Sequence, residues 1–174
     1  MRAAALALLV PSLALAQSRS GPEPRYLAPL SYGVRLGGMI AYSSPAGAPS
    51  GVGGGAYALF DQQSILADVS ADVFGGAHLF TMGAGLGVYF ALTPGGDLTP
   101  YVGGGARLAW VKFGGEGAFG LQLHGALGLL ASRRWSPHVR VELSWFADTM
   151  GEAEKGGGPR HYSNGPMATL GLGF

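Results

Sequence analysis

Apolar residues recur at every second position over long stretches of this sequence. Between Ile65 and Val73 the odd-numbered residues are all apolar, and Asp68 and Asp72 lie between them. The same alternation returns over residues 139–145. A period of two places successive side chains on opposite faces of a β-strand, whereas a helix needs a period of about 3.6. The alternation therefore predicts strands with one apolar face and one more polar face.

Eight runs of this kind follow one another along the chain. They cover approximately residues 32–42, 53–60, 64–74, 78–91, 98–111, 118–131, 137–147 and 162–174. Compact polar turns alternate with some longer connections, of which 148–161 is the longest and most charged. A tilted strand crosses a membrane with about 9–11 residues, and in lipid the sheet has to close so that every backbone group is paired. The pattern predicts an all-β fold: an eight-stranded antiparallel up-and-down transmembrane β-barrel.

The two faces of the predicted strands differ in chemistry. The outward face is apolar, with residues such as Leu36, Leu86 and Leu143. Gln122 and His124 are predicted to face inward, together with a charged set made up of Arg35, Asp68, Asp72, Arg107, Arg140 and Glu142. A buried charge is costly unless it is paired, so the charged set is expected to form an ion-pair network. The sequence leaves open which carboxylate pairs with which arginine.

Aromatic residues gather near the ends of the predicted strands, which is typical of the two girdles of a membrane barrel. The set comprises Tyr32, Tyr42, Phe60, Phe74, Tyr89, Phe90, Tyr101, Trp110, Phe119, Trp135, Trp145, Tyr162 and Phe174. The direction of Tyr57 stays open, because the glycine-rich run around it has no clear alternation. Arg133 and Arg134 lie in a predicted turn and are expected to be solvated or to touch lipid headgroups.

The composition excludes several classes of function. The 174 residues carry a formal net charge of +1, so the chain lacks the basic surface of a nucleic-acid-binding protein. The absence of cysteine excludes disulfides, cysteine-based zinc sites and thiol nucleophiles. The four histidines show no metal-ligand spacing, and we expect neither a metal nor another cofactor.

The first residues have the features of a cleaved secretory signal. Arg2 supplies a positive charge, an apolar stretch follows, and Ala14-Leu15-Ala16 forms a small-residue cleavage site. We therefore expect a signal peptide over residues 1–16 and an irregular segment, rich in proline and serine, over 17–30. The barrel is expected to occupy residues 31–174.

These features resemble the small eight-stranded outer-membrane β-barrel proteins of bacteria, of the OmpA and OmpX transmembrane type. The resemblance rests on the signal segment, the eight alternating runs, the run Thr99–Gly105 and the C-terminal Leu170-Gly171-Leu172-Gly173-Phe174. It implies that the barrel-assembly machinery reads Leu170, Leu172 and Phe174, and that the C-terminus is periplasmic. It also implies a monomer in contact with outer-membrane lipids, including lipopolysaccharide. The expected role is structural or one of surface contact, and a filled eight-stranded interior leaves no wide pore.

A second hypothesis comes from the segment His161-Tyr162-Ser163-Asn164-Gly165. It is similar to the His-x-Ser-Asn motif of lipid A 3-O-deacylases, which are also eight-stranded outer-membrane barrels. That resemblance implies His161 as base, Ser163 as nucleophile and Asn164 as part of the oxyanion site. The family has a carboxylate after the motif, whereas no Asp or Glu follows Glu154 here. The phase of the last run also turns Ser163 inward, so a non-enzymatic barrel is expected and the esterase is the alternative.

Overall fold

The computed structural model of the chain describes residues 30–43, 47–113, 116–150 and 163–174. The predicted signal peptide, and nearly all of the irregular segment after it, lie outside the described residues. The strands are β1 (Leu30–Ile40), β2 (Tyr42–Ser43), β3 (Ser50–Gln62), β4 (Ile65–Gly75), β5 (Leu79–Ala91), β6 (Leu98–Phe113), β7 (Glu116–Ala131), β8 (His138–Met150) and β9 (Ser163–Gly173). No helix in this part of the chain is long and apolar enough to cross a membrane.

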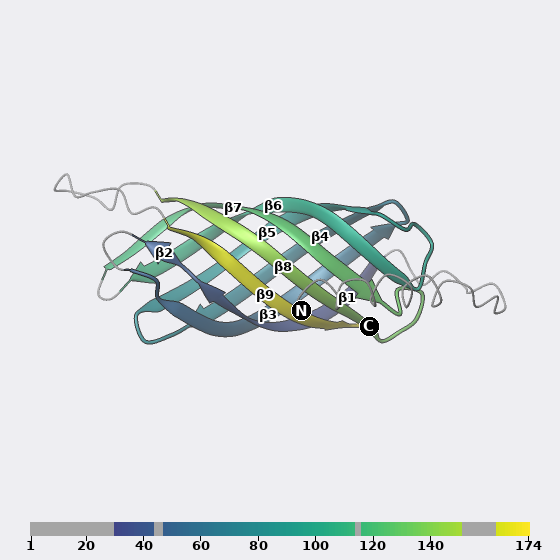
Figure 1. Cartoon of the computed structure of the whole chain (residues 1–174). Helices are drawn as coiled ribbons and strands as arrows, with labels where there is room; N and C mark the ends of the chain where they lie inside the picture. The colour runs from purple at the N-terminus through teal and green to yellow at the C-terminus, as the bar shows by residue number, and fades with distance from the viewer. Residues whose placement is uncertain (1–29, 44–46, 114–115, 151–162) are drawn as a thin grey trace, which may run out of the picture.

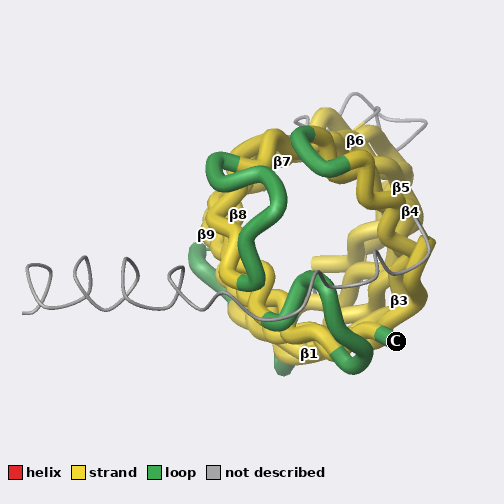
Figure 2. Tube along the Cα trace, turned by 90° about the vertical axis from the view of Figure 1, so that its right-hand side faces the viewer, coloured by secondary structure: helices red, strands yellow, loops and turns green. Residues whose placement is uncertain are grey.

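Each long strand pairs antiparallel with the next, in the order β1-β3-β4-β5-β6-β7-β8-β9, and β9 pairs back with β1. The sheet therefore closes on itself, and Figure 2 shows the strands as a ring. The two-residue β2 continues the line of β1 beyond Ala41 and pairs with the start of β9 (Figure 1). With β2 counted as this extension, the chain is the predicted eight-stranded antiparallel up-and-down barrel, and that prediction is confirmed.

The connections divide between the two ends of the barrel. The turn end carries the connections 63–64, 92–97 and 132–137, none longer than six residues, and Phe174 lies there too. The loop end carries the connections 44–49, 76–78, 114–115 and 151–162, of which two are short and 151–162 is the longest in the barrel. The strands agree with the predicted runs to within a few residues. β3 starts earlier than the predicted residue 53 because its ladder to β1 continues through Val52 and Gly51 to Ser50.

Side chains alternate between the lumen and the outer surface along the long strands. On β5, Leu79 is 2% exposed and its neighbour Phe80 is 38% exposed. Tyr57, whose direction was open, is 3% exposed and faces the lumen. The outer face exposes large apolar side chains, among them Val34, Leu36, Val52, Val69, Met82, Leu86, Val88, Leu108, Leu123, Leu127, Leu143 and Leu170.

The girdle prediction was wrong for three of its aromatic residues. Phe74, Tyr89 and Tyr101 are 1%, 1% and 2% exposed and fill the lumen. Adjacent residues of a strand face opposite sides, so Tyr89 and Phe90 cannot both face outward. The members that are exposed are Tyr32, Tyr42, Phe60, Phe90, Phe119, Trp135, Trp145 and Phe174. Trp110 is half-buried, and Tyr162 lies outside the described residues.

Two apolar clusters fill the lumen, one toward each end of the barrel. The cluster near the loop end consists of Met39, Ala41, Phe74, Leu79, Ala109, Val111, Phe146 and Met167. The cluster near the turn end consists of Tyr57, Leu59, Leu66, Tyr89, Tyr101, Ala126 and Leu130. The interior is therefore packed with side chains, as a barrel of this strand number allows.

Candidate functional site

The structure places all the charges that were predicted to face inward inside the lumen. Arg35, Asp68, Asp72, Arg107, Arg140 and Glu142 are each between 2% and 6% exposed. They come from β1, β4, β6 and β8, and each strand contributes them from its inward-facing positions. The charges fall into two groups, one around Arg140 and the other around Asp72.

Arg140 is the centre of the first group. Its Nη1 donates to Asp68 Oδ2 at 2.6 Å, and its Nη2 donates to Glu142 Oε2 at 2.5 Å. Its Nε donates to the hydroxyl of Tyr101 at 2.8 Å. That hydroxyl in turn donates to Glu142 Oε2 at 2.9 Å. Every nitrogen of the guanidinium therefore has a partner, and one cation is shared between two buried carboxylates.

Aromatic rings surround the same guanidinium. The Cζ atom of Arg140 lies 5.5 Å from the ring centroid of Tyr57, 4.9 Å from that of Tyr89 and 5.3 Å from that of Tyr101. The half-buried His124, also predicted to face inward, has its Nε2 3.4 Å from the hydroxyl of Tyr89. Cation–π contacts gain strength where water is excluded, so these rings add to the ion pairs.

Asp72 is the centre of the second group. Arg35 binds both of its carboxylate oxygens, through Nε to Oδ1 at 2.7 Å and through Nη2 to Oδ2. Arg107 approaches the same Oδ2 with its Nη1 at the longer distance of 3.5 Å. The pairing that the sequence left open is thus Arg35 with Asp72, and Arg140 with the two other carboxylates.

A further buried carboxylate was missed by the sequence analysis. Asp148 was assigned to a loop, but it lies in β8 and is 3% exposed. It accepts hydrogen bonds from the Gln122 amide and the Ser163 hydroxyl. Its even number gives it the same inward direction as Arg140 and Glu142, and this parity was the signal that could have found it.

The structure divides the residues of the esterase motif. Ser163 is 2% exposed and lies in the lumen, where its hydroxyl donates to Asp148. Asn164 is exposed on the outer face, and His161 lies outside the described residues. A serine nucleophile needs an adjacent base and access to its substrate. The described contacts give Ser163 a buried carboxylate as partner, and they do not favour the esterase hypothesis.

Arg133 corrects another prediction, because it is 8% exposed rather than solvated. Its Nε donates to Asp61 Oδ2 at 2.6 Å and its Nη2 to Asp61 Oδ1 at 2.5 Å. It also donates to the carbonyl of Gln63 and, at 3.3 Å, to Thr99 Oγ1. Hydrogen-bond partners in two neighbouring hairpins draw the side chain inward. Arg133 thereby ties the 132–137 turn to β3, β6 and the 63–64 turn.

The C-terminal strand presents the predicted assembly residues on the outer face. Leu170, Leu172 and Phe174 are 58%, 39% and 63% exposed. Phe174 and Tyr32 exchange backbone hydrogen bonds of 2.7 Å and 3.1 Å at the turn end, next to the β1–β9 ladder. The alternating apolar side chains therefore stand on the seam where the first and last long strands meet.

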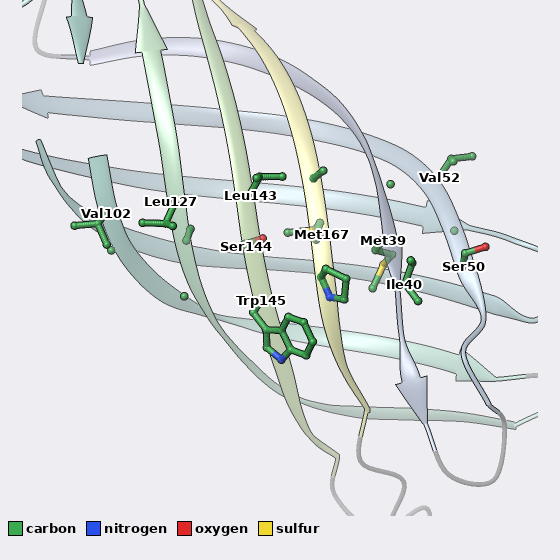
Figure 3. A pocket seen from close by; sticks show the side chains of 17 residues that line it. Met39, Ile40, Ser50, Val52, Val102, Leu127, Leu143, Ser144, Trp145 and Met167 are labelled. Carbon is green, nitrogen blue, oxygen red and sulfur yellow. The ribbon is translucent and has the colours of Figure 1, made fainter. Parts of the chain in front are cut away.

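A pocket of about 830 Å³ is lined by residues of β1, β3, β6, β7, β8 and β9 (Figure 3). Its side chains are mostly apolar: Met39, Ala126 and Met167 are buried, and Val52, Leu127, Leu143 and Trp145 are exposed. Ser50 and Ser144 are the polar side chains of the lining. Among the described residues that line the pocket there is no Asp, Glu, His, Lys or Arg. Neither does this part of the chain hold a group of three or more His, Cys, Asp or Glu residues placed to bind a metal. The pocket therefore offers an apolar surface and no acid, base or metal ligand.

No protein-family model and no curated protein matches this chain. Its structure is similar to that of Neisserial surface protein A (NspA), with a TM-score of 0.61 and 13% identity over 84% of this chain and 98% of NspA. It is also similar to the N-terminal β-barrel domain of OprF from Pseudomonas aeruginosa, with a TM-score of 0.50 and 13% identity over 82% of this chain and 97% of that domain. The chain has the fold of the small eight-stranded outer-membrane barrels.

The tight interior of such a barrel predicts a strong effect of a methyl group at Gly128. A Cβ atom at this position on β7 would collide with the ring of Tyr101, which binds Arg140 and Glu142. We expect Gly128→Ala to lower the free energy of unfolding by about 1–3 kcal/mol, the usual cost of overpacking. Urea unfolding of the protein in detergent measures this.

Gly125→Ala on the same strand is the matched control. A Cβ there would lie 4.0 Å from the nearest atom, the carbonyl oxygen of Gly103, so the variant should unfold like the wild type. Equal stabilities of the two variants would contradict the packing described for Tyr101.

Proposed function

We propose that this protein is a bacterial outer-membrane barrel with a structural or surface-contact role. The observation that carries the proposal is the apolar outer face of a closed sheet: Leu36, Leu86, Leu127 and Leu143 are between 62% and 72% exposed. A water-soluble protein rarely leaves so large an apolar surface uncovered. In lipid the same surface is favourable, and the closed ladder leaves no unpaired strand edge. The surrounding partners would be outer-membrane lipids, including lipopolysaccharide, around a monomer.

The filled lumen supports a scaffold rather than a wide pore. The Arg140 group, the Asp72 group and the two apolar clusters all lie in the interior. A large solute would have to break several buried ion pairs to pass. The function is therefore assigned to the outer and end surfaces of the barrel.

The proposed orientation places the turn end in the periplasm. Short turns face the periplasm in outer-membrane barrels and the longer loops face outside, and the longest connection of this chain, 151–162, belongs to the loop end. Phe174 would then be periplasmic, and Leu170, Leu172 and Phe174 would meet the barrel-assembly machinery as the final strand is added. A cysteine introduced at Ser132 should be shielded from an impermeant thiol reagent in intact cells, and labelling there would reverse the orientation.

The membrane location is tested by heat modifiability and extraction. Protein from the envelope fraction should resist carbonate extraction, and the unheated sample should migrate differently from the boiled one in detergent gels, because a closed barrel keeps its fold in detergent. Recovery of the folded chain in the soluble fraction without detergent would contradict the proposal.

The absence of a wide pore is tested separately in planar bilayers. The reconstituted barrel should show no conductance step comparable to that of a general porin, whose larger strand number leaves an aqueous channel. A porin-sized step from the purified protein would overturn the scaffold role while leaving the membrane location intact.

A further inference from the structure

Arg107 is a buried cation with much of its hydrogen-bonding capacity unused. It projects from β6 into the lumen and is 6% exposed. Its salt bridge to Asp72 is long, 3.5 Å, and Arg35 already holds both oxygens of that carboxylate. The Nε and Nη2 atoms of Arg107 are buried and have no hydrogen-bond partner in the described part of the chain. A buried donor without a partner costs free energy, and more so when it carries charge.

Asp148, a buried carboxylate without a salt bridge in the described residues, lies two strands away from Arg107. Asp148 on β8 is 3% exposed, and its hydrogen-bond partners Gln122 and Ser163 are both uncharged. The salt bridges of Arg35 and Arg140 go to other carboxylates. Asp148 is therefore a desolvated carboxylate without a cation among the described salt bridges, and an uncompensated buried charge is costly.

The register of the sheet brings the two charges into one row. Arg107 is the cross-strand partner of Gln122, and Gln122 is the cross-strand partner of Asp148. Neighbouring strands are about 4.8 Å apart, so the long arginine side chain can span the row. Gln122 Oε1, between the two charges, is also buried and without a partner among the described residues. A change of the Arg107 side-chain rotamer that moves its guanidinium toward β8 would give Gln122 Oε1 a hydrogen-bond donor and Asp148 a counter-ion.

We propose that Arg107 is the counter-ion of Asp148. Asp72 is then neutralised by Arg35, and each of the three arginines has its own carboxylate partner or partners. In this arrangement Ser163 is a positioning residue, because its hydroxyl orients Asp148 from the first residue of β9. The pair ties β6 to β8 and links the charged interior to the start of the closing strand.

Two double-mutant cycles test the assignment, with urea unfolding of the detergent-folded protein as the measurement. One cycle combines Arg107→Met with Asp148→Asn, and the other combines Arg107→Met with Asp72→Asn. We expect coupling of about tenfold or more in the unfolding equilibrium constant for the Asp148 cycle, and weaker coupling for the Asp72 cycle. The reverse order would assign Arg107 to Asp72. Absence of coupling in both cycles would mean that water satisfies Arg107, and either result overturns the proposal.

A charge exchange provides a second test if Arg107→Met does not fold. Arg107→Asp places a second acid beside Asp148 and should abolish refolding into detergent. Adding Asp148→Arg to the same chain should restore the folded, heat-modifiable species. A doubly exchanged chain that folds no better than Arg107→Asp alone contradicts the pair.

Discussion

Replacing Arg140 with alanine is expected to destabilise the barrel by about 3–5 kcal/mol, the usual cost of removing one partner from a buried ion pair. Asp68 and Glu142 would stay buried without the cation that they share. Tyr101 would also lose the guanidinium that donates to its hydroxyl. The free energy of unfolding, measured by urea titration of the protein refolded in detergent, checks the prediction.

Val141→Ala is the matched control for this substitution. Val141 is the next residue of β8, faces outward and is 43% exposed, so it lies on the lipid side in the proposed function. Its truncation should change the free energy of unfolding far less than Arg140→Ala does. A second variant that also carries Asp68→Asn and Glu142→Gln should recover part of the loss. Equal and small effects of Arg140→Ala and Val141→Ala would refute the central position of this arginine.

A second large effect is expected from a charge on the outer face. Leu143 lies midway along β8, between Leu127 and Ala168 in the ladder, and is 63% exposed. If lipid covers this face, Leu143→Arg should cost about 2–4 kcal/mol, as charges near the bilayer midplane do. Folding yield and unfolding free energy in lipid bilayers of defined composition report the cost.

An arginine introduced near the loop end should change the free energy of unfolding much less. Asn164 is exposed close to the start of β9, where the interface is expected, and Asn164→Arg should cost no more than about 1 kcal/mol. A Leu143→Arg variant that inserts as readily as Asn164→Arg would show that this face does not meet the membrane core.

Strand identity and side-chain direction could be predicted because a period of two survives in the sequence. The inward direction of Arg35, Asp68 and Arg140 followed from their apolar neighbours. Where the alternation of apolar and polar residues is interrupted, strand ends and side-chain directions could not be predicted. The glycines before Tyr57 left its direction open. The last positions of β8 were assigned to a loop, so Asp148 was not assigned to the lumen.

Pair identities could not be predicted, because closure of the barrel joins residues that are remote in sequence. Asp68 meets Arg140 across the lumen although the two are 72 residues apart. The inward turn of Arg133 had no sequence signal either, since a turn has no alternation. Its partner Asp61 lies in a different hairpin, and the two residues are close only because of the order of the hairpins around the closed barrel.

The seam between β1 and β9 fixes the order in which this protein can become stable. Before β9 is in place, β1 and β8 are two open edges whose backbone groups have no partner, and in the proposed membrane setting lipid offers none. A chain lacking β9 would therefore be an open sheet rather than a weaker barrel. We therefore expect the stability of the closed sheet to depend on the addition of the last long strand.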